Sequence, residues 1–175
     1  MSQHDCSETW TLADGSKLKL RHIAPSDAVR EQAFVHGLST QSSYFRFHGT
    51  IKDLSKKDLA GFTNPDSQNA IALIVLSVGE TDEEEIGVAR YVINPDGRSC
   101  EFAIVVADAW QKRGIGMKLM NALIKHLQTS GVKRISGTVL KRNSAMRKFS
   151  KRLGFVETYV PDDPSTLVVT KHLMD

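Results

Sequence analysis

The feature that most constrains this chain is the stretch Val106–Met117, where an apolar strand runs into a glycine-containing turn and then into a long amphipathic helix. Gly114 and Gly116 allow the backbone to approach a ligand closely because neither carries a Cβ atom. Unpaired amides at the start of a helix attract anions, and lysine and arginine side chains around this turn add positive charge. The stretch therefore predicts a phosphate-binding turn; the alternative is a tight strand-to-helix connection without a ligand.

Two better-known phosphate-binding patterns do not fit this turn. The pattern GxxxxGK[ST] is absent, and GxGxxG fails because Leu119 stands where its third glycine should be. A Gly-x-Gly at a helix start does not by itself identify the phosphate compound that binds.

The order of the surrounding elements predicts a mixed α/β sheet, of the α+β type, rather than an alternating doubly wound one. The apolar run 70–78 predicts a buried strand, and Ser55 with Asp58 forms a capping box that predicts a helix start. Expected strands cover 9–12, 17–23, 70–78, 86–93, 101–106, 134–139, 155–160 and 167–171; expected helices cover 25–36 (capped by Ser26 or Asp27), 41–47, a segment from 55, 111–130 and 143–153.

Two further segments each allow two interpretations. The acidic segment 79–85 is expected to be a solvated hairpin loop, the alternative being a lure for basic substrate segments. Tyr44, Phe45 and Phe47 could line a substrate cleft or pack as part of a helix core.

The composition suits one soluble globular domain and excludes several functions. Among 175 residues, 41% are hydrophobic and 25% charged, and the net charge of +3 is spread along the chain, so we expect no nucleic-acid partner. No signal pattern or membrane-length apolar run is present, so we expect a cytoplasmic protein with no membrane partner. Cys6 and Cys100 form no metal-ligand cluster and the six histidines lack metal spacing, so we expect no metal.

Two motifs resemble one known family. Gln111-Lys112-Arg113-Gly114-Ile115-Gly116 resembles the [QR]-x-x-G-x-G/A signature of the GNAT superfamily of N-acetyltransferases. Asn143–Phe149, followed by Leu153-Gly154-Phe155, is similar to that family's asparagine-led helix and its Gly-Phe sequence. The spacing between the motifs leaves room for one helix and one strand, as the family requires, and the resemblance extends over roughly residues 17–171.

Three other stretches are similar to the bacterial protein-lysine acetyltransferases within this superfamily: Leu38–Phe47, Gly87–Arg90 and Cys100–Val106. Some of those proteins also carry a nucleotide-sensing or acyl-CoA-synthetase-like domain, for which we expect no room here. We expect residues 1–16 to form an N-terminal leader and hairpin strand, and residues 17–175 to form a single GNAT-like acetyltransferase domain.

The resemblance implies a mostly antiparallel central sheet flanked by helices and implies acetyl-CoA as co-substrate, with its pyrophosphate on the turn. Asn143 would contact the pantetheine arm; the alternative is a plain helix N-cap, and the two roles are compatible. The residues that the resemblance assigns to the cofactor are Ile104, Val105, Val106, Gln111, Lys112, Arg113, Gly114, Ile115, Gly116, Met117 and Asn143.

Transfer to an amine requires a proton acceptor, because a lysine amine with a pKa of about 10.4 is mostly protonated at neutral pH. Glu101, which begins the strand leading into the turn, is the candidate general base, acting directly or through a water. We expect partial desolvation by Phe102, Ile104 and Val106 to raise its pKa, and the resemblance supports a glutamate base here. The alternative is a solvated or salt-bridged carboxylate at a strand end.

The tetrahedral oxyanion should be met by a backbone amide near Val105 or Val106, where the family's strand separates from its neighbour. Many family members protonate the leaving thiolate with a tyrosine, and Ser150 stands at that position here. A serine hydroxyl is a poor acid, so a water, or no dedicated acid, would take that role.

The sequence therefore predicts an N-acetyltransferase that moves the acetyl group of acetyl-CoA to a primary amine, with the lysine side chain of a protein as the leading acceptor. Two alternatives remain at this point: acetylation of a small-molecule amine, and a non-catalytic acyl-CoA-binding sensor. Glu101 argues against the sensor, because a protein that only binds needs no base.

Overall fold

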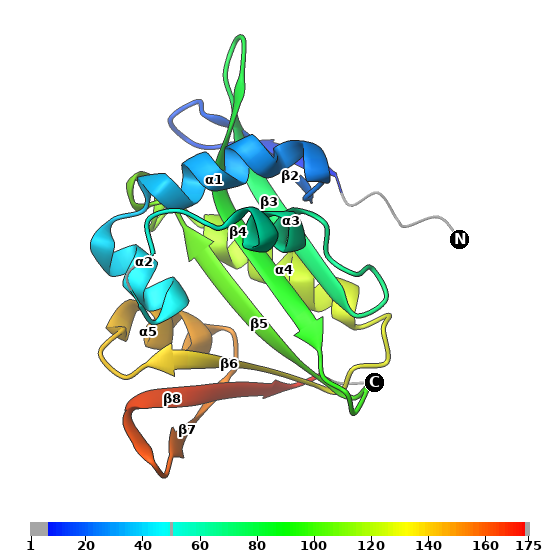
Figure 1. Ribbon diagram of the computed structural model, residues 1–175, viewed down its shortest axis with the longest axis vertical. Coiled ribbons are helices and arrows are strands. Elements are labelled where there is room, and N and C mark those ends of the chain that lie inside the picture. The colour runs from blue at the N-terminus through cyan, green and yellow to red at the C-terminus, as the bar shows by residue number, and fades with distance from the viewer. Residues whose placement is uncertain (1–6, 50, 174–175) are drawn as a thin grey trace.

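The computed structural model describes residues 7–49 and 51–173, so residues 1–6 of the predicted leader, Cys6 among them, lie outside the described residues. Eight strands form one sheet in the order β1-β2-β3-β4-β5-β6-β8-β7 (Figure 1). β5 and β6 run parallel, and the other neighbouring strands are antiparallel. The strands are β1 Glu8–Thr11, β2 Lys17–His22, β3 Ala70–Val78, β4 Glu83–Ile93, β5 Ser99–Val106, β6 Arg134–Leu140, β7 Val156–Val160 and β8 Asp163–His172.

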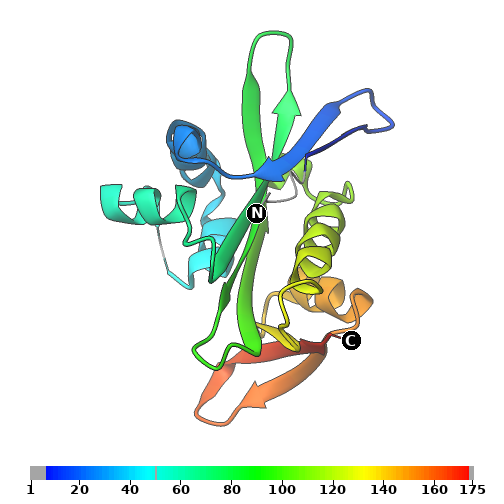
Figure 2. The same ribbon diagram turned by 90° about the vertical axis from the view of Figure 1, so that its right-hand side faces the viewer.

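Helices cover both faces of this sheet (Figure 2). One face carries α1, α2 and α3, and the other carries α4 and α5. The helices are η1 Pro25–Asp27, α1 Ala28–Gly37, α2 Thr40–Phe47, α3 Lys56–Thr63, η2 Asp108–Trp110, α4 Ile115–Leu127 and α5 Ser144–Arg152. This confirms the predicted single α/β domain with a mostly antiparallel central sheet. Within the described ranges, no helix has the length and apolarity needed to cross a membrane.

β3 shows why one run of sequence is apolar throughout. Ile71, Leu73 and Val75 pack into the core beneath α4, while Ile74 and Leu76 pack into the core beneath α1. A strand that is buried on both faces has no polar side to alternate with, so the period-2 pattern disappears.

Several local signals are confirmed, and others need correction. The Ser55 hydroxyl accepts the amide of Asp58 at 3.0 Å, as the capping box predicts. The predicted cap Asp27 stands before α1 but makes no capping bond to α1. Its carboxylate accepts the amide of Ala24 at the start of η1, together with two bonds from Arg21. The helix expected over 111–130 is shorter: residues 111–114 form a turn, and α4 covers Ile115–Leu127.

The expectation of a solvated loop over 79–85 is wrong for its last three residues. β4 begins at Glu83, which pairs with Val78 of β3, and Glu85 is only 3% exposed. The register shifts between Val75 and Leu76, where Ile86 is the extra residue on β4. A bulge of this kind reverses the in-out alternation of a strand, so Ile86 enters the core beneath α4 and Glu85 turns toward α1.

Glu85 meets a second buried carboxylate there, that of Glu31 on α1. An Nη atom of Arg90 lies 3.1 Å from Glu31, and the Arg90 guanidinium stacks 4.4 Å from the ring centroid of Phe62. No described donor bonds either oxygen of Glu85. Burial, reinforced by the neighbouring Glu31, raises the pKa of Glu85 far above its ordinary value, so the side chain is a neutral acid at neutral pH.

This neutral acid gives the fold a definite pH dependence. The folded protein retains a proton on Glu85 that the unfolded chain loses above the ordinary carboxyl pKa, so the free energy of unfolding should fall as pH rises. We expect Glu85→Gln to raise that free energy by about 1–2 kcal/mol at pH 8 and to flatten its dependence on pH. Urea denaturation between pH 5 and 9 measures both effects. The exposed neighbour Glu84→Gln should follow wild type; identical curves for Glu85→Gln and wild type would contradict the protonated acid.

Candidate active site

The central feature of the site is a gap between the two parallel strands. β5 and β6 pair over only three residues on each strand, ending at the pair Glu101 and Ser136. Beyond that pair the strands diverge toward their C-terminal ends (Figure 1). β5 still pairs with β4 as far as Val106, so only the β6 side of β5 is left open.

The register shows which backbone groups face the gap. Ser99 accepts a bond from Asn94, and Ala107 donates one to Ile86, so odd-numbered residues of β5 bond to β4. The even-numbered residues Ile104 and Val106 therefore direct their amides toward the gap. The prediction that named Val105 together with Val106 needs correction for Val105, whose amide faces β4.

Aromatic packing holds the point where the strands part. The Phe102 ring lies so close to Gly137 of β6 that a Cβ atom there would be 2.6 Å from it. The same ring packs against Phe155, with centroids 5.3 Å apart. A side chain at residue 137 would displace Phe102, so the glycine permits the closure of the core at the vertex of the gap.

The turn after β5 has the backbone of an anion site. Lys112 and Gly114 both have positive φ, 62° and 82°, and α4 begins directly after Gly114 without a side-chain cap. Left-handed residues set among right-handed ones turn successive amides to one side, forming a concave nest for anions. The first α4 amide bonded within the helix is that of Lys118, so the amides of residues 115–117 are free to meet a ligand.

The cations near this turn are not equivalent. Arg113 pairs with Asp14 in the β1–β2 turn at 3.1 Å, and Lys118 pairs with Glu8 of β1. Lys112 pairs with no carboxylate in the part of the chain that the structure describes. Lys112 is also a non-glycine residue in the left-handed region, which strains its backbone, and such strain is common at functional sites.

α5 lines the gap on the α4 side. A Cβ atom on Gly116 would lie 3.5 Å from the Phe149 ring of α5 and 3.8 Å from Ile104. Asn143 caps α5, because its Oδ1 atom accepts the amide of Met146 at 3.1 Å. The plain-cap interpretation of Asn143 is therefore present in the structure, and it leaves the side-chain amide nitrogen available.

The structure places Glu101 at the vertex of the gap, on the face that carries α1, α2 and α3. The side chain is exposed and forms no hydrogen bond or ion pair with a described residue. The expectation of partial desolvation by Phe102, Ile104 and Val106 is wrong, because even-numbered side chains of β5 point to the opposite face. Glu101 is thus an accessible carboxylate beside a gap lined with free amides.

Ser150, at the position of the family's tyrosine, is only 1% exposed. Its hydroxyl has no hydrogen-bond partner among the described residues. A buried alcohol is a poor proton donor, so the expectation of a water, or of no dedicated acid, stays a prediction.

Sequence reasoning missed Asp108, which ties the turn to α2. Its carboxylate accepts both hydroxyls of Ser39 and Ser42 at 2.7 Å and the amide of Ser39 at 3.0 Å. Gln111 donates to the Ser42 hydroxyl at 3.3 Å and to the carbonyl of Val106 at 3.0 Å. An aspartate two residues after a strand carries no sequence signal of such a partner, because Ser39 and Ser42 lie about seventy residues away.

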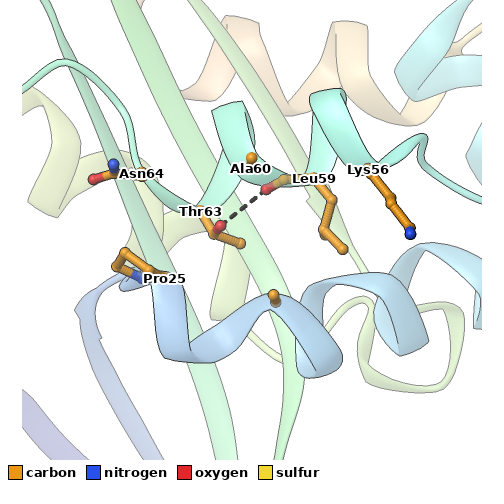
Figure 3. Close-up of a pocket in the computed structure, with 7 residues that line it drawn as sticks. Pro25, Lys56, Leu59, Ala60, Thr63 and Asn64 are labelled. Atoms are coloured by element: carbon orange, nitrogen blue, oxygen red, sulfur yellow. Dashed lines mark hydrogen bonds between the residues drawn. The ribbon is translucent and has the colours of Figure 1, made fainter.

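Two pockets lie near these elements. One groove runs between the N-terminal end of α1 and α3 and includes Leu59 and Thr63, whose hydroxyl donates to the Leu59 carbonyl (Figure 3). This groove contains none of the predicted site residues. The second pocket lies at the C-terminal end of β6, beside Tyr44 of α2. Among the described residues, no group of three or more His, Cys, Asp or Glu side chains could hold a metal ion.

The fold and site define a class of protein that comparisons with known proteins identify. Residues 37–155 match the acetyltransferase (GNAT) family. Acetyltransferase PA5475 of Pseudomonas aeruginosa is 31% identical over 158 residues, which cover 90% of this chain and 85% of that protein. The chain therefore belongs to the GNAT family and is an acetyl-CoA-dependent acyltransferase.

More specific relatives share either sequence or structure with this chain. Acetyltransferase Pat of Mycolicibacterium smegmatis is 50% identical over 56 residues, which cover 32% of this chain and 17% of Pat. The GNAT domain of S. lividans PAT superposes with a TM-score of 0.85 at 27% identity, covering 95% of this chain and 97% of that one. A RimL acetyltransferase in complex with coenzyme A shares the fold, with a TM-score of 0.69 at 14% identity over 95% and 98% of the two chains.

In the turn that begins α4, a Cβ atom should destabilise the protein at Gly114 but not at Gly116. We expect Gly114→Ala to lower the free energy of unfolding by about 1–2 kcal/mol, because φ is positive there. Gly116→Ala is the matched control, since its Cβ would meet only ordinary contacts, and it should leave stability unchanged or raise it by up to about 1 kcal/mol. Urea denaturation measures both; equal effects would contradict the assigned turn geometry.

The hydrogen bonds of Asp108 to Ser39 and Ser42, the Asp108 tether, should make part of the free energy of unfolding sensitive to acid. Partial burial would raise the pKa of Asp108, but bonds from Ser39 and Ser42 outweigh it and hold the pKa below its ordinary value. The stabilisation is therefore present at neutral pH and is lost as pH falls through the folded-state pKa. We expect Asp108→Ala to cost about 1–3 kcal/mol at pH 7 and less at pH 3. Hydrogen exchange should show faster opening of α2; unchanged exchange there would contradict the tether.

Proposed function

We propose that this protein is an N-acetyltransferase that moves the acetyl group of acetyl-CoA to the lysine side chain of a protein, with Glu101 as general base. One observation carries the proposal: the β5–β6 gap joins an accessible carboxylate at its vertex to an anion-binding turn at its mouth. A long substrate with anionic phosphates at one end and a reacting thioester at the other would fit along this gap.

The residues present suit acetyl-CoA. Its pyrophosphate would bind the free amides of Ile115, Gly116 and Met117, where Gly116 offers no Cβ atom to obstruct it, with Lys112 as an unpaired cation. Its pantetheine arm would lie in the gap and bond to backbone groups of β5, as an added strand does. Asn143 and Gln111 would border this path on its two sides.

The reaction then follows from the groups that remain. The amine nitrogen attacks the thioester carbonyl carbon while Glu101 accepts its proton, directly or through a water. The C=O π pair moves onto oxygen, and the amide of Ile104 or Val106 stabilises the oxyanion. Collapse of the intermediate returns the oxyanion's electron pair to the C=O bond and breaks the carbon–sulfur bond, leaving the acetylated amine and the coenzyme A thiolate. A water protonates the thiolate, because Ser150 is buried.

Two observations support a protein lysine as acceptor. Glu101 is exposed, so a side chain carried on a macromolecule can reach it. The stretches Leu38–Phe47, Gly87–Arg90 and Cys100–Val106 resemble the bacterial protein-lysine acetyltransferases, and the GNAT domain of S. lividans PAT superposes on almost the whole chain.

The test is thiol release from acetyl-CoA by wild type and by Glu101→Gln, with a lysine-rich protein and a panel of small amines as acceptors. We expect the substitution to lower kcat by about 10²–10⁴-fold, because it removes the proton acceptor, and to leave the Kd for acetyl-CoA unchanged. Glu80→Gln, at an exposed position in the loop between β3 and β4, is the matched control and should turn over like wild type.

The outcomes separate the candidate functions. Turnover with small amines alone would replace the protein acceptor by a small one. Acetyl-CoA binding without thiol release from any acceptor would overturn the catalytic proposal in favour of a sensor. Full activity in Glu101→Gln would remove the base assignment and leave the transferase.

A further inference from the structure

The pocket at the C-terminal end of β6 has a volume of about 610 Å³ and takes no part in the reaction described above. Tyr44 of α2 lines one side of it, and Lys141 and Arg142, which follow β6, line another. Arg147 of α5 and Ser165 of β8 complete the polar part of its wall. The pocket is therefore built from four elements that meet at the mouth of the gap.

Two cations in this wall have no acidic partner. Arg147 is neutralised by Glu157, which accepts two of its donors at 2.7 and 2.9 Å. Lys141 and Arg142 form no ion pair with a described carboxylate; they lie instead over aromatic rings, Lys141 over Tyr159 at 5.4 Å.

The arginine is held in a defined orientation. The Arg142 guanidinium lies 4.7 Å from the ring centroid of Tyr44 and 5.8 Å from that of Phe45. Such a contact uses the flat face of an arginine and leaves its in-plane donors free, in the fork that matches a carboxylate. Asp163, the first residue of β8, accepts bonds from Ser165 and Thr166 and forms no ion pair with Arg142.

The distance from the base shows which part of an acceptor would reach the pocket. Ser136 pairs with Glu101, and Leu140, on the same face of β6, lines the pocket. Four residues of strand separate them, which is about 13 Å. An extended peptide advances about 3.3 Å per residue. A group in the pocket would therefore stand up to four residues from the lysine at Glu101, and as few as two where the side chains of the lysine and of the acidic residue cover part of the distance.

We propose that Lys141 and Arg142 form a specificity site that binds the carboxylate of an acidic residue two to four positions from the acceptor lysine. The inference rests on the proposed function, because it requires a polypeptide acceptor. It adds a sequence preference: lysines flanked by Asp or Glu are acetylated, and lysines in basic segments are repelled.

The test uses nonapeptides with one central lysine and Asp, Asn or Arg at each position two to four residues away. With wild type, we expect at least one Asp peptide to exceed its Asn counterpart about tenfold in kcat/KM, as a charge-assisted hydrogen bond allows. The Arg peptide should fall below both. Binding of the same peptides, measured by fluorescence anisotropy without acetyl-CoA, should follow the same order.

Two double variants show whether the pocket causes the preference. The neutral K141Q/R142Q should remove it, and the reversed K141E/R142E should favour the Arg peptide. Lys125→Glu, on the exposed side of α4, changes the net charge by as much as K141Q/R142Q and by half as much as K141E/R142E. This control should retain the wild-type order of peptides. An inverted preference cannot arise from a loosened fold, which would lower all rates together.

Each contrary outcome is distinguishable. Equal rates for Asp and Asn peptides at every position would overturn the inference and leave the lysine acetyltransferase. No transfer to any peptide or to an intact protein, with small amines accepted, would overturn both. A loss of coenzyme A affinity in K141Q/R142Q equal to the loss for the peptides would assign the cations to the cofactor and overturn the inference.

Discussion

The site depends on one constraint: β5 and β6 pair for only three residues before they part. A parallel pair that continued would bury the amides of Ile104 and Val106 in a ladder and leave no opening in the sheet. At the vertex of the gap the Phe102 ring packs against Gly137, and beyond the vertex Gly116 lies close to both Phe149 of α5 and Ile104 of β5. The two strands of a single sheet thereby provide a carboxylate, free amides and an anion site along one line.

Much of the fold follows from the sequence because its signals are local. The apolar run of β3 and the Ser55 capping box each depend on a few neighbouring residues, and the structure confirms them. The direction of Glu85 could not be predicted in this way. It depends on a bulge that is defined only when β4 meets β3, and one inserted residue reverses which side chains face inward.

In the site, too, features set by local sequence could be predicted and features set by strand pairing could not. The motif from Gln111 to Gly116 located the turn, because glycine positions and positive charge are visible in the sequence. Which β5 amides are free depends on strand register, so the sequence alone could not separate Val105 from Val106. The sequence identified Glu101 as a candidate base, and the structure places it at the vertex of the gap. The expected desolvation of Glu101 is absent, because strand alternation directs its apolar neighbours to the other face. The cofactor and base assignments of these residues stay predictions.

The Asp108 tether has a consequence for the order of events in the molecule. It joins the turn that begins α4 to the first turn of α2, so the two segments share one set of hydrogen bonds. A ligand that orders one of these segments also restricts the other through the shared hydrogen bonds, so less conformational entropy is lost when a second ligand binds there. By thermodynamic reciprocity, whatever binds against α2 and whatever binds at the turn must change each other's affinity by the same factor. A coupling carried by the side chains of Asp108, Ser39 and Ser42 would therefore act with equal strength in both directions.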